Sequence, residues 1–284
     1  MEHMSTALLD ADILLYIASR GAEDKIDWED GSDPVITANF DKGVSIVNDV
    51  ITRWHRMSGM DDYAIVFSDR INPCFRNAIY PIYKLHRVGY ERPELYDILS
   101  DWIKDNTTAD WYLWDTLEAD DTLGIIQMEM NREGHPTCIV SIDKDMLTIP
   151  GKHLNPNKTD DPGPMPPGPK QQNNATLTDV SPAEADYNWM MQTVAGDRVD
   201  NYKGAPGIGA KGAAKLLDPH FGDLDGMWNA ALDGFEEQWD KPNWRTKFQF
   251  EDPFDEALAN ARCARILRDG DFNRATGEVK LWTP

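Results

Sequence analysis

Four short apolar runs, separated by longer segments, constrain the fold of this chain most strongly. They occupy residues 7–10, 63–67, 111–114 and 137–142. Between the first two runs, residues 41–57 repeat apolar side chains at the spacing of an amphipathic helix. Short buried strands that alternate with helices predict an α/β fold, with a mainly parallel central sheet flanked by helices.

Acidic residues stand where these predicted strands end. The carboxyl ends of parallel strands meet at one edge of a sheet, which is where such folds place their sites. A single Asp at such a point is often only a helix N-cap. Carboxylates at four strand ends favour a shared site instead. The residues concerned are Asp10, Asp69, Glu118, Asp120, Asp121, Asp143 and Asp145, and the membership of Asp12 stays open.

The densest acidic group lies in residues 116–124 (TLEADDTLG), where three carboxylates fall within four positions. Like charges this close raise one another's pKa. One interpretation is the first turn of a helix, whose dipole favours acidic side chains. The other is a divalent metal, which takes hard oxygen ligands. Taken alone, the stretch fits the helix interpretation better, and the other acidic strand ends favour the metal.

The charge of the chain is unevenly distributed. A net charge of −21 over 284 residues argues against a nucleic-acid partner if the charge is spread uniformly. However, residues 70–92 carry five cations against the single acid Glu91, and residues 203–215 carry three lysines and no acid. These two basic patches keep nucleic acid open as a partner.

The cysteines and the lengths of the apolar runs bear on localisation. Cys74, Cys138 and Cys263 are far apart and match neither a zinc spacing nor a disulfide framework, which predicts a reducing cytoplasm. No apolar run reaches the length of a membrane span, and the first residues lack the pattern of a signal peptide. We expect a cytoplasmic protein without membrane contact.

A proline-rich segment, residues 151–175, predicts a long loop that divides the chain into regions 1–175 and 176–284. After this loop, Ser181 and Glu184 have the spacing of a capping box at the start of a helix. The alternating run 278–282 predicts a hairpin or a final strand.

A glycine-rich turn lies within residues 195–217, where it leads into an alanine-rich helix. Glycines let a backbone approach a ligand closely, and the N-terminus of the next helix presents free N–H groups to phosphate. The alternative is a tight helix–helix turn without a ligand, but the pattern favours a grip on a DNA backbone. The residues expected to contribute are Gly207, Gly209, Lys211 and Lys215. In the same segment, Asp197 and Asp200 are spaced to share one helical face.

Basic and aromatic residues alternate in residues 75–87 (FRNAIYPIYKLHR). Rings that stack on bases, with cations that pair with phosphates, suit single-stranded or frayed nucleic acid. The alternative is an ordinary basic surface helix.

In this order the motifs resemble the flap endonuclease and 5′→3′ exonuclease family of PIN-like metal nucleases, over nearly the whole chain. The chain is most similar to the 5′→3′ exonucleases of short-tailed lytic phages. The narrower match also rests on residues 148–151 and 264–282. The motifs that carry the resemblance are residues 8–12, 67–69, 80–87, 117–121, 141–145 and 196–217.

The resemblance implies hydrolysis of phosphodiesters with two Mg²⁺ or Mn²⁺ ions. Asp10, Asp69, Glu118 and Asp120 would bind the metals, and Asp121, Asp143, Asp145, Asp197 and Asp200 would complete the site directly or through water. Lys84 and Arg76 would contact the scissile phosphate. Tyr83 would stack near the terminal base, and Arg87 would lie on a basic arch at about 70–106.

The family also implies a C-terminal helical region with a helix-three-turn-helix at about 195–217. Gly207, Gly209 and Lys211 would hold the duplex there, and relatives imply a K⁺ ion at this motif. The expected substrates are duplex ends, nicks and 5′ flaps of DNA, with RNA–DNA hybrids as a further substrate. We expect a monomer that acts in the cytoplasm of an infected bacterial host.

Three rival functions compete with this interpretation. In a haloacid-dehalogenase-type phosphatase, Asp10 would form a phospho-aspartate, but that leaves the acidic groups near Glu118 and Asp143 unexplained. A non-catalytic binder of DNA structures would not need every acid to be present. An RNA-directed nuclease of the PIN type is the third, and the glycine-rich turn favours DNA over it.

Overall fold

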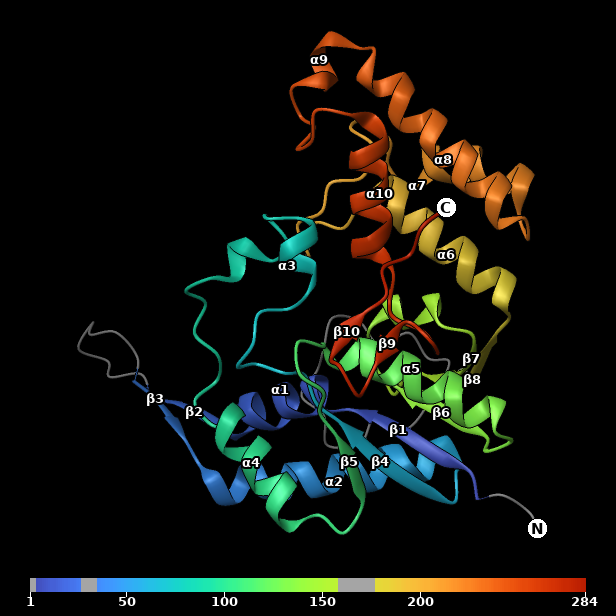
Figure 1. Ribbon diagram of the computed structural model, residues 1–284. Helices are drawn as coiled ribbons and strands as arrows, with labels where there is room; N and C mark the ends of the chain where they lie inside the picture. Colours follow the sequence, from blue (N-terminus) through green and yellow to red (C-terminus); the bar gives the residue numbers. More distant parts are fainter. Residues whose placement is uncertain (1–3, 27–34, 158–176) are drawn as a thin grey trace.

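The structure is a computed structural model, and it describes residues 4–26, 35–157 and 177–284 (Figure 1). Its centre is a six-stranded sheet with strand order β5-β4-β1-β6-β7-β8. The first five strands in this order run parallel to their neighbours, and only β8 is antiparallel, to β7. The prediction of a mainly parallel sheet is therefore confirmed, and the sheet has β7 and β8 in addition to the four predicted strands.

The strands of the described chain are β1 (Thr6–Asp10), β2 (Glu23–Ile26), β3 (Val35–Ala38), β4 (Asp62–Val66), β5 (Asp110–Tyr112), β6 (Thr137–Val140), β7 (Gly151–Leu154), β8 (Leu177–Val180), β9 (Phe272–Asn273) and β10 (Glu278–Val279). The α-helices are α1 (Ala11–Ala22), α2 (Phe40–Ser58), α3 (Arg76–Ile79), α4 (Tyr96–Asn106), α5 (Ala119–Arg132), α6 (Pro182–Ala195), α7 (Ala210–Leu217), α8 (Leu224–Trp239), α9 (Pro242–Arg245) and α10 (Pro253–Ala264).

Side chains of β1 alternate between two buried cores, as the pleat of a strand requires. Ala7 and Leu9 pack with residues of α1, α2 and α4, whereas Leu8 packs with residues of α5. The sheet is therefore covered on both faces, which explains why its central strands are almost purely apolar.

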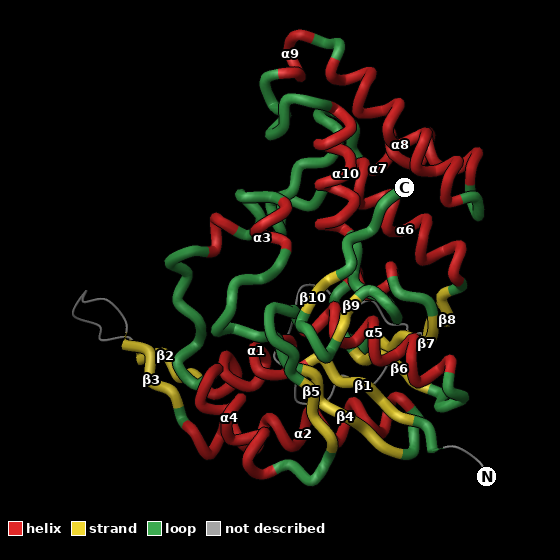
Figure 2. The backbone as a smooth tube through the Cα atoms, viewed as in Figure 1, coloured by secondary structure: helices red, strands yellow, loops and turns green. Residues whose placement is uncertain are grey.

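A separate core holds the C-terminal helices together. Helices α6, α7, α8 and α10 pack around Trp189 and Phe235, and Figure 2 shows them in the upper half of the molecule, above the strands. Tyr80 and Tyr83, which come long before these helices in the sequence, are buried in the same core. The segment around α3 thus packs on the C-terminal helices rather than on the sheet.

Two boundaries differ from the predicted ones. Residues Tyr96–Asn106 form α4, whose Leu99 and Ile103 are buried beside α1 and α2, so the predicted arch does not extend to residue 106. Gly151–Leu154 is strand β7, although it lies in the predicted proline-rich loop, and its partner β8 follows residue 175. The rest of that loop, residues 158–176, lies outside the described residues.

Two local predictions in the second half of the chain are confirmed: the capping box at Ser181 and Glu184, and the hairpin or final strand near the C-terminal end. Ser181 and Glu184 form both hydrogen bonds of a capping box at the start of α6. The tail forms a hairpin in which Val279 pairs with Phe272. Within the described ranges, no helix combines the length and apolar character needed to cross a membrane.

Candidate active site

The ends of β1 and β6 meet through the side chain of Ser141. Its Oγ donates to Asp10 Oδ2 over 2.7 Å and accepts from the backbone N–H of Asp143 over 3.1 Å. The other carboxylate oxygen of Asp10 accepts from the backbone N–H of Asp12. Burial, with the nearby charges of Asp12 and Asp143, raises the pKa of Asp10 to about 7. The parallel sheet thus brings Asp10 and Asp143 together, as the strand-end pattern predicts.

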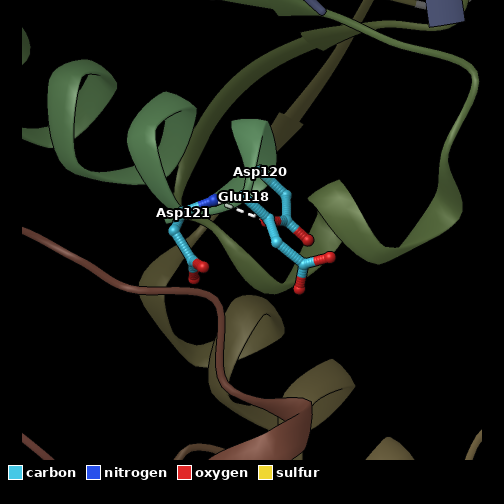
Figure 3. A group of neighbouring side chains, drawn as sticks. All are labelled: Glu118, Asp120 and Asp121. Carbon is cyan, nitrogen blue, oxygen red and sulfur yellow. Dashed lines mark hydrogen bonds between the residues drawn. The ribbon is translucent and has the colours of Figure 1, made fainter. Parts of the chain in front are cut away.

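The acidic triplet lies at the start of α5. One carboxylate oxygen each from Glu118, Asp120 and Asp121 lies within 4.8 Å of the others. Figure 3 shows Glu118 and Asp120 directed to the same side, whereas Asp121 turns away from them. Burial, together with the charges of Asp121 and Glu118, raises the pKa of Asp120 well above its usual value. The helix interpretation of the triplet is therefore confirmed, and the three carboxylates are close enough together to hold a metal ion.

Lys84 connects this triplet to the second half of the chain. Its Nζ lies 2.5 Å from Glu118 Oε1 and 3.5 Å from Asp200 Oδ2. Burial opposes ionisation of Glu118, but Lys84 and Arg76 outweigh it and lower the pKa of Glu118 to about 2. Burial likewise opposes the charge on Lys84, yet Glu118 and Asp200 raise the pKa of its ammonium group. Lys84 is therefore a permanent cation beside two carboxylates.

Arg76 does not reach the position that the resemblance implies. Only 1% of its surface is exposed, and its guanidinium donates to both oxygens of Asp121, over 2.6 and 2.7 Å. It also donates to the backbone carbonyls of Cys263 and Arg265. A side chain with all these partners and no solvent access has no free donor for a phosphate, so we correct its predicted role to a structural one. Asp121, fully buried, is its counter-ion.

Tyr83 is also placed differently from its expected role. The ring is 2% exposed and lies in the core of the C-terminal helices, so it has no free face for a DNA base. Its hydroxyl lies 2.8 Å from Glu118 Oε2 and 3.1 Å from Asp200 Oδ2. Tyr83 is therefore a buried support for two predicted metal ligands.

Asp197 and Asp200 lie in a turn and not on the predicted helical face. The turn is closed by a bridge between Asp197 and Tyr202, and Asp197 Oδ1 accepts from the backbone N–H groups of Val199 and Asp200. Arg87 donates to Asp200 Oδ1 over 2.8 Å, so this arch residue is paired with an acid in the structure.

A second acidic group forms where β6 ends beside this turn. Lys144 Nζ lies 3.5 Å from Asp145 Oδ1 and 3.4 Å from Asp197 Oδ2, which brings the two acids to a common cation. Gln192 of α6 donates to Asp145 Oδ1 over 2.8 Å. Burial, then the charge of Asp143, raises the pKa of Asp145 to about 6.

The carboxylates of Asp69 and Asp12 bind neighbouring groups other than the acids of the site. The carboxylate of Asp69 accepts from the backbone of Ile71, Asn72 and Thr116, and from the Asn72 side chain, so it fixes the loop before the triplet. Asp12 accepts from Ser68 and pairs with Arg70. Neither carboxylate contacts another acid among the described side-chain contacts.

The predicted glycine-rich turn joins α6 to α7. Gly207 and Gly209 are exposed, and so are Lys211 and Lys215 on α7. Gly209 is the N-cap and supplies no side chain, so the first N–H groups of α7 have no side-chain partner at this cap. The first of the two helices around this turn, α6, starts at Pro182, before the predicted range 195–217, whereas α7 lies within that range.

Several supporting residues of this site could not be recognised from the sequence. Ser141 binds Asp10, Ser68 binds Asp12 and Gln192 binds Asp145. Of these three residues only Ser68 directly follows a predicted strand, which is the one signal that the sequence offered. Cys74, with its thiol 3.5 Å from Glu118, also lies beside the triplet.

The structure is an α/β domain with carboxylates gathered at the strand ends, next to a basic segment. This arrangement is the one expected of a metal-dependent nuclease. The family model of the 5′-3′ exonuclease N-terminal resolvase-like domain matches residues 7–161, more than half of the chain. The protein therefore belongs to the 5′-3′ exonuclease family, and the resemblance predicted from its motifs is confirmed.

Two phage proteins resemble the chain over nearly its whole length. The exodeoxyribonuclease of Enterobacteria phage T3 is 26% identical, covering 98% of this chain and 92% of the relative. The exonuclease of Escherichia phage T7 is 24% identical, covering 98% and 93%. A flap endonuclease of bacteriophage T5, solved as a pseudo-enzyme–product complex with DNA and metal ions, has a TM-score of 0.52 at 13% identity, covering 90% of this chain and 99% of that one. That likeness shows a shared fold.

Proposed function

We propose that this protein is a metal-dependent 5′→3′ exodeoxyribonuclease on duplex DNA, with flap endonuclease activity and cleavage of RNA–DNA hybrids as further activities. It would act in phage DNA replication, primer removal or degradation of host DNA. The observation that carries the proposal is the meeting of Glu118 and Asp200 around Lys84, which joins acids of the N-terminal and C-terminal regions at one point. A phosphatase built on Asp10 gains no support, because it leaves the acidic groups around Glu118 and Asp145 without a role and the family model matches residues 7–161 as an exonuclease domain.

The donor set supports a divalent metal. It consists of carboxylate oxygens, which Mg²⁺ and Mn²⁺ prefer over nitrogen and sulfur ligands. Burial, and then the neighbouring like charges, raise the pKa of Asp10 and of Asp120, and a bound cation would stabilise both carboxylates in their charged form. The residues proposed to hold two such ions are Asp10, Asp69, Glu118, Asp120, Asp143, Asp145, Asp197 and Asp200, with Asp121 contributing only through its contacts. Bound divalent ions lower the pKa of water and stabilise a leaving oxygen.

The chain's own side chains bind and orient the scissile phosphate. Lys84 offers a cation that is charged at any working pH, and a phosphate oxygen can take the place that Glu118 holds beside it. Tyr83 and Arg87 keep Asp200 in position. Burial, then the charge of Glu118, raises the pKa of the Cys74 thiol, so this thiol is neutral and is no nucleophile.

The wider DNA contacts in this proposal follow the basic patches. Arg87 would face the single strand on the arch, and Gly207, Gly209, Lys211 and Lys215 would hold the duplex at a helix-three-turn-helix. A K⁺ ion at that turn and a monomeric state are parts of the same proposal. The phage T5 flap endonuclease, which was solved in a complex with DNA, supports DNA as the substrate.

The test uses duplex DNA labelled at the 5′ end in one sample and at the 3′ end in another, with Mg²⁺ or with EDTA. The Asp143→Asn/Asp145→Asn variant runs beside the wild type. We expect short 5′-labelled products that require metal and disappear in the variant. If folded wild-type protein cleaves no duplex, nick or flap, the nuclease proposal fails and a DNA-structure binder replaces it. Cleavage that survives in the variant would show that these two acids are not ligands.

A further inference from the structure

A third basic segment follows α8 and is separate from the two basic patches described above. Residues 241–249 (KPNWRTKFQ) contain three cations and no acid, in a chain of net charge −21. Lys241, Arg245 and Lys247 are all exposed. Figure 1 shows α9, which lies in this segment, at the end of the helical region farthest from the sheet. We call Lys241, Trp244, Arg245 and Lys247 the α9 surface.

The backbone of this segment is fixed in place. The ring of Phe248 meets Trp239 of α8 edge to face, with centroids 5.0 Å apart. The carboxylate of Glu256 on α10 accepts from the backbone N–H groups of Gln249 and Phe250, over 2.6 and 3.0 Å. At the other end of the segment, the backbone N–H of Lys241 donates to the carbonyl of Gln238 over 3.1 Å. Because both ends are held, the cations are presented from a fixed backbone.

Two of the three cations are available to a partner. Lys241 is paired with Glu237 over 2.8 Å. Arg245 and Lys247 form no ion pair within the described part of the chain. Each lies over an indole ring instead: Lys247 Nζ is 4.0 Å from the Trp244 centroid, and Arg245 Cζ is 4.5 Å from the Trp239 centroid. These ring contacts hold the two cations in position without neutralising them.

The α9 surface is continuous with the glycine-rich turn. A Cβ atom added to Gly207 would lie 3.0 Å from two ring atoms of Trp244, so the indole packs directly on this glycine. Lys215 of α7 is near enough to Glu237 to help lower the pKa of that carboxylate, after the larger effect of Lys241. The glycine-rich turn, α7 and α9 therefore form one surface.

We propose that the α9 surface binds the sugar-phosphate backbone of duplex DNA beyond the glycine-rich turn, an inference that rests on the proposed function. Each of the two partly exposed indole rings has a cation over it, and Trp244 also packs against Gly207, so the surface offers mainly charges and neither ring has both faces open to stacking bases. Fixed cations without an aromatic platform suit phosphates of a rigid duplex better than a flexible single strand.

The test compares Arg245→Gln/Lys247→Gln with the wild type in EDTA, by fluorescence anisotropy of labelled duplex and of labelled single strand over a salt series. We expect weaker duplex binding and a logarithmic salt slope that is lower by about 2, one unit for each phosphate that is no longer neutralised. Single-strand binding should change less. The matched control, Lys42→Gln/Arg56→Gln, removes two exposed cations from α2. Because α2 lies at the opposite end of the molecule in Figure 1, this control should leave both salt slopes unchanged.

Two results would overturn the inference. One is a duplex salt slope equal to that of the wild type in a variant with an unchanged circular dichroism spectrum. The other is an equal loss of binding for single strand and duplex, which would make a single strand the partner. With a wild type that cleaves DNA, the first result removes the α9 surface from the interface, and the second keeps it there but excludes duplex as its preferred partner. Both results leave the proposed function intact. A wild type that neither binds nor cleaves DNA would remove both.

Discussion

Arg76 and Asp121 form a two-pronged ion pair that is almost completely shielded from water. The pair joins three parts of the chain, because Arg76 lies on α3, Asp121 on α5, and both bind the backbone between Cys263 and Leu267. Without this partner the buried guanidinium would keep its desolvation penalty and lose both of its shortest charged hydrogen bonds, with only the longer contact to Glu118, over 3.3 Å, in compensation. The pair therefore ties the start of α5, and with it Glu118, to the C-terminal helices.

We predict that Asp121→Asn lowers the free energy of unfolding by about 3–5 kcal/mol, the usual effect of leaving one buried charge unpaired. Urea unfolding followed by circular dichroism measures this change. Combining it with Arg76→Met should give a double variant less destabilised than the sum of the single variants, by about 1–3 kcal/mol. The exposed pair Arg132–Asp269 is the control, since Arg132→Met should change stability by about 1 kcal/mol or less. Additive single effects would contradict a paired role for Arg76.

The raised pKa of Asp120 predicts a conflict between stability and function. Asp120→Asn keeps the shape and the acceptor for the Asp121 backbone N–H but removes a repelled buried charge. In EDTA the variant should melt at a higher temperature, by about 2–4 °C for each 1 kcal/mol of relieved repulsion. Metal-dependent cleavage should be abolished. Asp49→Asn, an exposed change on α2, should alter neither property, and a lower melting temperature for Asp120→Asn would contradict the predicted repulsion.

Gly196 lies where the backbone passes very close to that of Lys203, beside the turn that contains Asp197 and Asp200. Its φ is +70°, and a Cβ there would lie 2.3 Å from the carbonyl carbon of Lys203. Gly196→Ala should therefore destabilise the protein by about 3 kcal/mol or more, through both strain and overpacking. Gly222 has a φ of +86° with open space around it, so Gly222→Ala isolates the strain, at about 1–2 kcal/mol. Equal effects of the two substitutions, measured by urea unfolding, would show that the crossing relaxes freely.

His153 predicts a loss of stability in mild acid. Its Nε2 lies 2.8 Å from the carbonyl of Ile149, which makes Nε2 the protonated nitrogen, and Nδ1 has no partner among the described residues. Burial lowers the pKa of this imidazole from 6.5 to about 4. Between these values the unfolded chain binds a proton that the folded protein excludes, so stability falls as the pH drops through this window, by about 3 kcal/mol in total.

The measurement for His153 is unfolding free energy at several pH values, for the wild type and for His153→Gln. Glutamine can still donate to the Ile149 carbonyl but takes up no proton. The decrease in stability across the same window should therefore be about 3 kcal/mol smaller for the variant than for the wild type. Acidic residues titrate in both proteins and cancel in the comparison. Parallel stability curves would show that protonated His153 is tolerated in the fold.

The strand pattern predicted the central fold because its signal is local. The apolar runs near Leu8 and Ile139 can be buried on both faces only in a covered parallel sheet, and the acids after them must then meet at one edge. Strand β7 escaped prediction because His153 and Lys152 interrupt any apolar run, and its place is secured by pairing with β6 and β8. Pairing of this kind depends on distant residues that local spacing does not encode.

For the candidate site, too, the sequence predicted the placement of some residues and not of others. Motif order predicted which acids gather near the strand ends, including Glu118 and Asp145, and their role as metal ligands stays a prediction. It failed for Arg76 and Tyr83, because a basic or aromatic residue has the same sequence pattern whether it faces DNA or a core. Only burial, which is a property of the whole fold, distinguishes these cases: both side chains are covered by the C-terminal helices.

The pairing of β7 with β8 also bears on how this chain tolerates change. Leu154 and Leu177 are partners in the ladder, so the connection between them leaves the sheet and returns to it at adjacent points. The entropy of closing such a connection grows only with the logarithm of its length. A change in the length of the connection would therefore cost little closure entropy, provided that the contacts of Pro156 with Arg53 and of Asn155 with Ile142 are kept. Related chains can thus differ in length between Leu154 and Leu177 while β6, β7 and β8 keep their register.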